Sequence, residues 1–449
     1  MPSDRPDPAT FRRIWSLAWP TVLYSVLELS LGLADLVMVR GLGQDATAAI
    51  GLTRQIAFLL EAAALAIATG VITLVSQGVG SGNRQQVDGV IHQSTRLVFL
   101  LGVPVTLVGY LASRPLLLVM QASSETLSHG VPYLHVYFLG TVFLWGNFVS
   151  AAILRGTGDA MTPLKVVTAV SLLNIVLNYA LIFGVGPLPP YGVTGAALGT
   201  VAARAVGCVI YLVLLAHGTR HVRLRLRPVW GLDWTLTQRI LRVGMPPALA
   251  GIARNGARVV FLGMLGASAL GASMHAAAGV GLQVRLFSVL PALAFQIATA
   301  TLVGQAIGAG HLDQAEALAR RSVQLLSMIM AGVVAVTFLL ARPLAALFIE
   351  DPAVVTLGAT VLRWFAVAQF FSSVSICVQG ALMGAGDTKP ILRYTIVTQW
   401  GLLLSLTFIL VEFGWEPEGP LLAWVLAPLV QLVLMQRLLR SGRWKRLRV

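Results

Sequence analysis

Carboxylate side chains occur in the first two apolar stretches of the chain, where burying them is costly. Glu28 and Asp35 lie between Trp19 and Arg40, and Glu61 lies in the next stretch. A charged side chain at the centre of a bilayer costs about 2.5–3.5 kcal/mol on insertion scales. Glu28 and Asp35 are about two helical turns apart and therefore share one helix face. These groups indicate proton exchange or binding of a small cation, and we expect that role above all at Asp35.

Each carboxylate also has a structural alternative. Asp35 could cap its helix or pair with Arg40, and Glu28 could be either a relay group or a fixed partner of an arginine. For Glu61 a structural role is the stronger expectation. Pro20 should kink the first helix or free a carbonyl there, either as part of a conformational switch or as a packing adaptation.

Amide and hydroxyl groups could complete a site around Asp35. Asn174 and Asn178 are four residues apart and share a helix face. Thr200 follows in the next apolar stretch. Carboxylate, amide and hydroxyl oxygens can coordinate sodium or form hydrogen bonds with a protonated acid. Membrane helices also use Asn and Thr to bond their neighbours, and the spacing alone leaves that alternative open.

Most of the arginines within apolar stretches belong to the second half of the chain. Arg254 and Arg258 are one helical turn apart and either line a cavity in that half or extend toward the membrane surface. With Arg285, they are our candidates for a cavity lining. The acids of the first half and most of the buried cations of the second are thus segregated.

The composition is that of an integral membrane protein. Of 449 residues, 57% are hydrophobic and 11% are charged, and the mean hydropathy is +0.81, whereas soluble domains carry about 25% charged residues. Most apolar stretches reach the roughly 20 residues that a spanning helix needs. We predict an all-α integral membrane protein with twelve transmembrane helices at about 14–39, 54–77, 92–112, 130–153, 163–185, 192–216, 238–265, 276–305, 320–341, 355–382, 391–413 and 420–439.

The placement of the basic residues predicts the orientation. The net charge is +14, but Arg and Lys gather in alternate loops and at both termini, the pattern of cytoplasmic segments. We therefore expect both termini on the cytoplasmic side of the cell membrane, and no nucleic-acid partner.

Two pairs of segments show an internal duplication. Residues 75–83, VSQGVGSGN, resemble 303–311, VGQAIGAGH, and GTGD at 156–159 resembles GAGD at 384–387, at the same offset of 228 residues. Repeats of six spans have the same orientation in the membrane and can rock about a central cleft. We predict a V-shaped, two-lobed transporter with a cytoplasmic N-terminal tail (1–13), an N-lobe (14–217), a basic cytoplasmic linker (218–237), a C-lobe (238–440) and a basic cytoplasmic C-terminal tail (441–449).

The chain resembles the multidrug and toxic compound extrusion (MATE) family. The pieces that carry the resemblance follow one another along nearly the whole chain: WPTVLYSVLELSLGLADLVMVRGLGQDATAAIGL (19–52), VSQGVGSGNRQQ, ILRGTGDAMTP (153–163), LNIVLNYALIFG (173–184), GVTGAALGT (192–200), LVGQAIGAGHLDQA (302–315) and ALMGAGDTKP (381–390).

The resemblance implies an efflux antiporter and a set of site residues. Members export cationic or amphipathic compounds in exchange for Na⁺ or H⁺, and we expect a monomer in the lipid bilayer with no cofactor. The family's first-helix acid falls on Asp35, and its partners fall on Asn174, Asn178, Ala196 (through its carbonyl) and Thr200.

Two departures from the family pattern matter. Many members carry Asp at the position of Asn178, so this site lacks one negative charge, which disfavours divalent-like or strong Na⁺ binding at Asp35. The spans 238–265 and 355–382 contain no acid, which resembles the DinF-like branch, in which coupling resides in the N-lobe.

The alternative functions are a lipid-linked precursor flippase and an enzyme. A lipid-linked precursor flippase of the same superfamily tends to have fourteen spans and a cationic cavity. Twelve spans and the N-lobe acids argue against it, but Arg254, Arg258 and Arg285 keep it open. An enzyme is not expected, because we find no phosphate-binding GxxxxGK[ST], no HExxH and no GxSxG motif.

Overall fold

A computed structural model describes residues 8–187, 189–218, 233–267, 271–348 and 351–446. Every regular element within these ranges is helical. Most of the predicted linker 218–237 and half of the predicted N-terminal tail 1–13 lie outside the described residues, as do the last three residues.

Eleven helices of the described chain are long and apolar enough to cross a membrane, and α4 with α5 make a twelfth span that is bent by 47°. The prediction of twelve spans is thereby confirmed, with the fourth broken. The break falls at Gly140, where a β-carbon would lie 2.4 Å from Val201 Cγ2. The neighbouring helix therefore packs directly against the backbone at this point.

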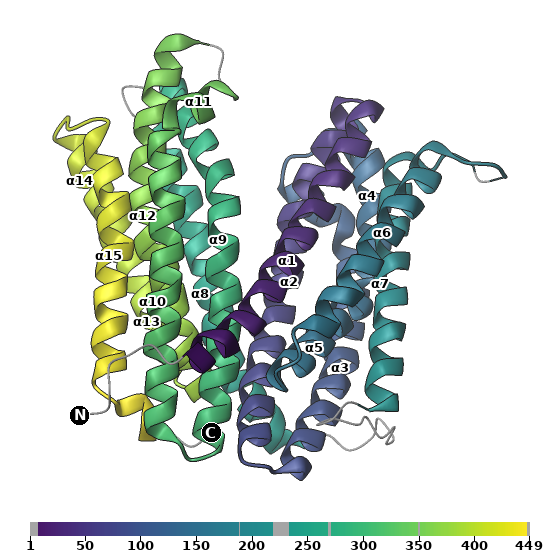
Figure 1. The fold of residues 1–449 in the computed structure, drawn as a ribbon. Helices are drawn as coiled ribbons and strands as arrows, with labels where there is room; N and C mark the ends of the chain where they lie inside the picture. Colours follow the sequence, from purple (N-terminus) through teal and green to yellow (C-terminus); the bar gives the residue numbers. More distant parts are fainter. Residues whose placement is uncertain (1–7, 188, 219–232, 268–270, 349–350, 447–449) are drawn as a thin grey trace. The chain divides into compact units, whose positions relative to one another are not determined.

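The described chain divides into two compact units (Figure 1). We call Leu23–Met245 the N-unit and Met1–Val22 with Pro246–Val449 the C-unit. The N-unit contains most of α1 (Pro8–Val39), then η1 (Arg40–Leu42), α2 (Gln44–Gly80), α3 (Arg84–Val119), α4 (Ser124–Leu139), α5 (Thr141–Gly156), α6 (Met161–Phe183), α7 (Gly192–His217) and the start of α8 (Trp234–Gly266).

The C-unit contains the start of α1, the rest of α8, and the remaining elements. These are α9 (Gly271–Gly308), α10 (Leu312–Leu339), α11 (Ala341–Ala346), α12 (Pro352–Ala385), α13 (Lys389–Thr395), the π-helical η2 (Ile396–Leu404), α14 (Ser405–Glu412), α15 (Glu418–Arg440) and the short η3 (Arg443–Arg446). Together α13, η2 and α14 form one span.

The first turns of α8 belong to the N-unit because α8 packs closely against α2. A β-carbon on Gly244 would lie 1.6 Å from Ala66 O, and one on Gly70 would lie 2.1 Å from Ile240 O. Gln93 on α3 also donates a hydrogen bond to Thr237. Compared with the predicted lobes 14–217 and 238–440, α1 and α8 each contribute one end to the other unit.

Both helices pass from one unit to the other beside a proline. Pro20 lies just before the boundary after Val22, and Pro246 begins the second part of α8. Proline removes one backbone N–H from the helix and weakens it there. The helix α1 is continuous through Pro20, and the kink predicted there stays a prediction.

The duplicated turns have matching geometry. Gly158 and Gly386 have φ values of 94° and 82°, in the left-handed region that favours glycine. In both turns the N–H of the next residue, an aspartate, donates a hydrogen bond to a leucine carbonyl. Asp159 N lies 3.0 Å from Leu154 O, and Asp387 N lies 2.9 Å from Leu382 O. The same backbone path at the same sequence offset indicates that one ancestral unit was duplicated.

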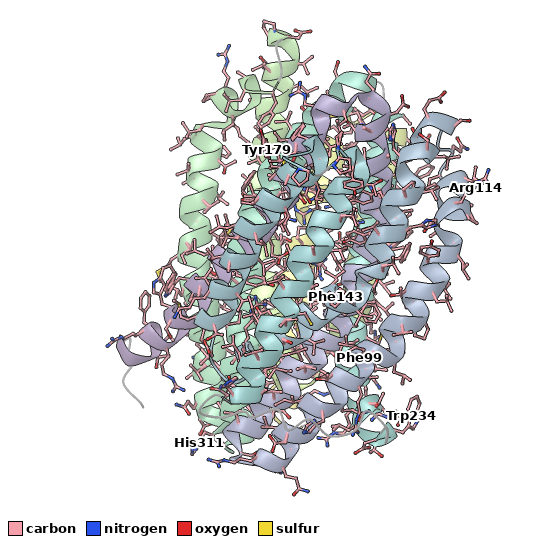
Figure 2. All side chains as sticks on the ribbon, turned by 90° about the vertical axis from the view of Figure 1, so that its right-hand side faces the viewer. Phe99, Arg114, Phe143, Tyr179, Trp234 and His311 are labelled. Carbon is pink, nitrogen blue, oxygen red and sulfur yellow. The ribbon has the colours of Figure 1, made fainter. Side chains whose placement is uncertain are left out.

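Large apolar side chains cover the outside of the N-unit. Phe99, Phe143 and Tyr179, on α3, α5 and α6, are all exposed and lie on the outer surface of these helices (Figure 2). Apolar residues on the surface of such helices face lipid rather than water.

Candidate functional site

Asp35 accepts two hydrogen bonds from helices that lie far from it in sequence. Asn178 Nδ2 on α6 donates to Asp35 Oδ1 at 2.6 Å. Thr200 Oγ1 on α7 donates to Asp35 Oδ2 at 3.3 Å. Both donors are buried and Asp35 is half-buried. Each carboxylate oxygen thus has a donor, which is the arrangement that stabilises the ionised form.

The second asparagine completes the network. Asn174 Oδ1 accepts a hydrogen bond from Asn178 Nδ2 at 3.1 Å, and Asn174 Nδ2 donates to Thr200 Oγ1 at 3.1 Å. The side chain of Asn174 is fully buried. It therefore holds in place the two side chains that donate hydrogen bonds to Asp35. The structure thus brings together four residues named from the sequence: Asp35, Asn174, Asn178 and Thr200.

One oxygen of this set has no partner. Asn178 Oδ1 is buried and accepts no hydrogen bond from the described residues. Leaving such an atom unpaired costs about 1–3 kcal/mol, so the atom is available to a proton donor or a cation. It belongs to the same network as the oxygens of Asp35, Asn174 and Thr200.

Glycine on α7 makes room for this network. A β-carbon on Gly199 would lie 2.1 Å from Asn178 Oδ1, and one on Gly195 would lie 2.3 Å from Leu181 O. Small residues let membrane helices approach closely. Ala196, the predicted carbonyl ligand, is buried one turn before Thr200, and its carbonyl role stays a prediction.

Arg204 is the functional candidate that the sequence prediction omitted. It lies one turn beyond Thr200 on α7, and its charge acts on Asp35, Glu28 and Glu61. Its Nη1 donates to Tyr137 Oη at 3.2 Å, and its carbonyl accepts from Asn147 Nδ2 at 2.7 Å. The four-residue spacing from Thr200 was the signal that could have identified it.

A small internal cavity connects Glu28 with Arg204. Both residues line a space of about 20 Å³ together with Tyr24 and Asn147. A cavity of this size with several polar groups can hold one water molecule. Glu28, which had no partner named from the sequence, therefore lies beside a cation. Glu61 interacts with the same cation through its charge.

The arginines of the C-unit form a separate cluster. Arg285 Nε donates to Gln369 Oε1 at 3.0 Å, and Arg254 Nη2 lies 3.5 Å from Gln379 Oε1. Arg258 donates to Asn255. The Nε of Arg254 is buried without a hydrogen bond from the described residues. Glutamine carbonyls, not carboxylates, are thus the partners of Arg254 and Arg285.

An aromatic wall lies beside this cluster. The guanidinium of Arg285 is 5.8 Å from the centre of the Trp424 ring, and Trp424 stacks on Phe261 and Phe365 with centroid distances of 4.6 and 4.9 Å. The charges of the three arginines act on one another. The three arginines thus gather positive charge beside an apolar, aromatic surface.

Two similar halves of six membrane spans define the class of membrane transporters built from parallel repeats. The MatE family model matches residues 20–180 and 255–409, more than half of the chain. The chain belongs to the MATE family of transporters.

Individual relatives agree with this assignment. The chain is 28% identical to the probable multidrug resistance protein NorM of Thermotoga maritima, over 98% of this chain and 94% of that protein. It is 26% identical to a protein of Shewanella oneidensis named FAD transporter, over 83% and 79%. The structure of a MOP superfamily transporter from Pyrococcus furiosus has the same fold, with a TM-score of 0.88 at 23% identity over 97% of both chains.

Proposed function

We propose that the chain is a multidrug efflux antiporter that exports cationic or amphipathic compounds and takes in H⁺ or Na⁺ through Asp35. The contact between Asn178 Nδ2 and Asp35 Oδ1 at 2.6 Å carries the proposal, because a carboxylate on a spanning helix that is bonded to an amide supports a role in ion exchange. The multidrug resistance relative from Thermotoga maritima supports drugs as the substrates.

The coupling would work through the charge of Asp35. The ionised carboxylate accepts hydrogen bonds from Asn178 and Thr200 and favours the state that takes up a cationic drug. Protonation from outside removes that negative charge and weakens both bonds, so that the drug is released. Pro20 and Pro246 are where α1 and α8 could bend during alternating access. One charge that crosses 100 mV supplies about 2.3 kcal/mol.

We favour the proton as the coupling ion. Among the described residues, Asp35 is the only carboxylate in the hydrogen-bonded set. Asn178 stands where many family members carry Asp. A single carboxylate with amide neighbours suffices for proton exchange, whereas Na⁺ prefers more negative oxygen ligands. Transport measured under a pH gradient, with and without Na⁺, decides between them: efflux that requires Na⁺ would overturn the proton assignment.

The decisive experiment is efflux from everted vesicles by Asp35→Asn. We expect drug transport driven by the ion gradient to be lost, because an uncharged side chain at position 35 resembles the protonated carboxyl and no longer responds to the gradient. Glu125→Gln is the matched control, because Glu125 is an exposed carboxylate in the first turn of α4. Full transport by Asp35→Asn would overturn the coupling role.

We further propose that the protein works as a monomer in the cytoplasmic (inner) membrane with both termini in the cytoplasm. The basic loops and tails support this orientation. Single cysteines placed at Arg84 and at Glu125 test it, since an impermeant thiol reagent added to intact cells should label only position 125. Labelling of position 84 would reverse the orientation.

A second candidate function is transport of a phosphate-bearing amphiphile, such as a lipid-linked precursor. The observation that favours it is the cluster of Arg254, Arg258 and Arg285 beside Trp424. The relative named FAD transporter is compatible with it, because FAD carries phosphate groups. Resistance profiling against a cell-wall complementation assay separates the candidates: complementation that depends on Arg285 would favour the flippase.

A further inference from the structure

A large pocket opens at one end of the C-unit, away from the helix interiors described above. Its volume is about 1020 Å³, and its walls come from the start of α10, the turn between α12 and α13, α13 itself, and the end of α15 with η3. Four basic residues and one acid line it: Lys389, Arg393, Arg443, Lys445 and Asp387.

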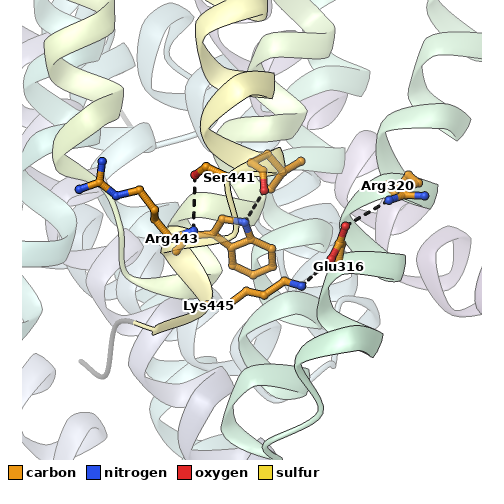
Figure 3. Close-up of polar contacts among 7 residues, drawn as sticks. Glu316, Arg320, Ser441, Arg443 and Lys445 are labelled. Carbon is orange, nitrogen blue, oxygen red and sulfur yellow. Dashed lines mark hydrogen bonds and ion pairs between the residues drawn. The ribbon is translucent and has the colours of Figure 1, made fainter.

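Two of the four basic residues of the pocket, Lys389 and Arg393, have no acidic partner among the described residues. Lys445 pairs with Glu316, which also pairs with Arg320 at 3.1 Å (Figure 3). Lys389 and Arg393 are exposed, and their side chains have no hydrogen-bond or ion-pair partner among the described residues. Cations that outnumber the acids around one space attract an anionic ligand.

The acid of the pocket differs from its counterpart in the other repeat. In the N-unit Asp159 accepts hydrogen bonds from Thr162 N and Oγ1 at 2.9 and 2.6 Å. The position that corresponds to Thr162 is Pro390, which has neither N–H nor hydroxyl. Asp387 therefore has no such bond to make and instead lies near Arg443, whose charge acts on it.

The wall formed by the C-terminal segment is held in place. Trp444 is fully buried, and its Nε1 donates to Leu439 O at 2.7 Å. The N–H of Arg443 donates to Ser441 Oγ at 3.4 Å (Figure 3). Because Trp444 anchors the segment, the neighbouring Arg443 and Lys445 are presented to the pocket by a folded structure.

The pocket lies where the membrane spans end. Its residues fall between the spans Val354–Ala385 and Lys389–Glu412, at the start of the latter, and just after Glu418–Arg440. This is the level of lipid headgroups, where juxtamembrane basic residues attract anionic lipids by about 1 kcal/mol each.

We propose that this pocket binds the phosphate-bearing headgroup of an anionic phospholipid. Lys389, Arg393 and Arg443 contact the phosphate oxygens, and Asp387 accepts a hydrogen bond from a hydroxyl of the headgroup. Leu312 and Leu438, which also line the pocket, provide apolar surface for the first part of the lipid chains. The proposal is independent of Asp35 and of the coupling ion.

The test is native mass spectrometry of the purified full chain with phosphatidylglycerol or phosphatidylcholine. We expect phosphatidylglycerol to bind the wild type and the double variant Lys389→Gln/Arg393→Gln to bind it about 30-fold more weakly. The matched control is Arg437→Gln/Arg440→Gln, which removes two exposed charges of α15 that do not line the pocket. Arg393→Lys should retain binding, because it keeps the charge.

Two outcomes would overturn the proposal. One is an equal loss of phosphatidylglycerol binding in the pocket variant and in the control variant, which would indicate only a general effect of surface charge. The other concerns the source of the phosphate. If inorganic phosphate alone binds with the same dependence on Lys389 and Arg393 and displaces the lipid, the ligand is a soluble phosphate compound. Monodisperse elution of each variant shows that it is folded.

Discussion

Asn178 Nδ2 donates a hydrogen bond of 2.6 Å to Asp35 Oδ1, although the two residues are 143 positions apart. The same nitrogen donates to Asn174 Oδ1 at 3.1 Å, so both of its protons are used. The amide fixes the carboxylate without adding charge. The identity of residue 178 should therefore decide which ion the site prefers.

Asn178→Asp should create a sodium site. Two neighbouring carboxylates repel each other and either share a proton or bind a cation. We expect Na⁺ affinity to rise about ten- to a hundredfold, measured as ²²Na⁺ binding by the purified protein. Asn178→Ala, which adds no charge, is the control and should gain no sodium binding. An unchanged sodium response in Asn178→Asp would contradict the assignment.

Thr200→Val should weaken coupled efflux while Thr200→Ser should not. Valine keeps the shape of the side chain but removes the donor to Asp35 Oδ2 and the acceptor for Asn174. A hydrogen bond to a charged group contributes about 1.5–3 kcal/mol, and this one is long, so we expect a loss of about tenfold in drug efflux driven by a pH gradient. Equal activity of the two variants would show that the hydroxyl has no part in coupling.

Gly199→Ala should damage the site through packing alone. The new β-carbon would lie 2.1 Å from Asn178 Oδ1 and 2.9 Å from Asn178 N, so that α6 and α7 must separate. Overpacking of this kind costs about 1–3 kcal/mol and should lower the midpoint of thermal unfolding in detergent. Gly251→Ala is the control, because nothing lies within 4 Å of its β-carbon. A wild-type midpoint for Gly199→Ala would contradict the close approach.

Arg204→Met should be partly rescued by Glu28→Gln. Removing the cation leaves Glu28 and Glu61 in the membrane without its compensating charge, which should destabilise the protein. If Glu28 is its partner, removal of that acid restores part of the lost stability, with a coupling of about 0.5–3 kcal/mol. The readout is a double-mutant cycle on the thermal midpoint. Additive effects would mean that the two side chains act separately.

Asp387→Asn should stabilise the protein at neutral pH. Burial raises the pKa of Asp387 above its ordinary value of 3.8, against the opposing charge of Arg443. A carboxyl whose pKa is higher in the folded than in the unfolded state contributes stability at pH values below its unfolded-state pKa. That stability is lost as the pH rises through its folded-state pKa. The variant cannot ionise, so its thermal midpoint should exceed that of the wild type at pH 7, and the difference should vanish near about pH 4.

The other repeat supplies a control of opposite sign. Asp159→Asn keeps an acceptor for Thr162 N, but it replaces the charged acceptor of the Thr162 hydroxyl. It should therefore be neutral or slightly destabilising at pH 7, by up to about 1 kcal/mol. A destabilised Asp387→Asn at neutral pH would show that its carboxylate is needed where it lies.

The composition and spacing of the chain were enough to predict the spans and to name the four residues that form the hydrogen-bonded network of Asp35. Runs of about twenty apolar residues define membrane helices because the bilayer has a fixed thickness. Asn174 and Asn178 share a helix face because of the 3.6-residue period. The branch within the family and the monomeric state stay predictions.

Tertiary structure alone decided which polar groups meet. In a membrane the apolar faces of a helix are nearly equivalent, so periodicity does not specify its rotation or its neighbours. Contact of Asn178 with Asp35 and of the first part of α8 with α2 therefore depends on packing at single glycines such as Gly199 and Gly244. The pocket beside Arg443 depends likewise on the burial of Trp444, which brings residues from distant helices to one space.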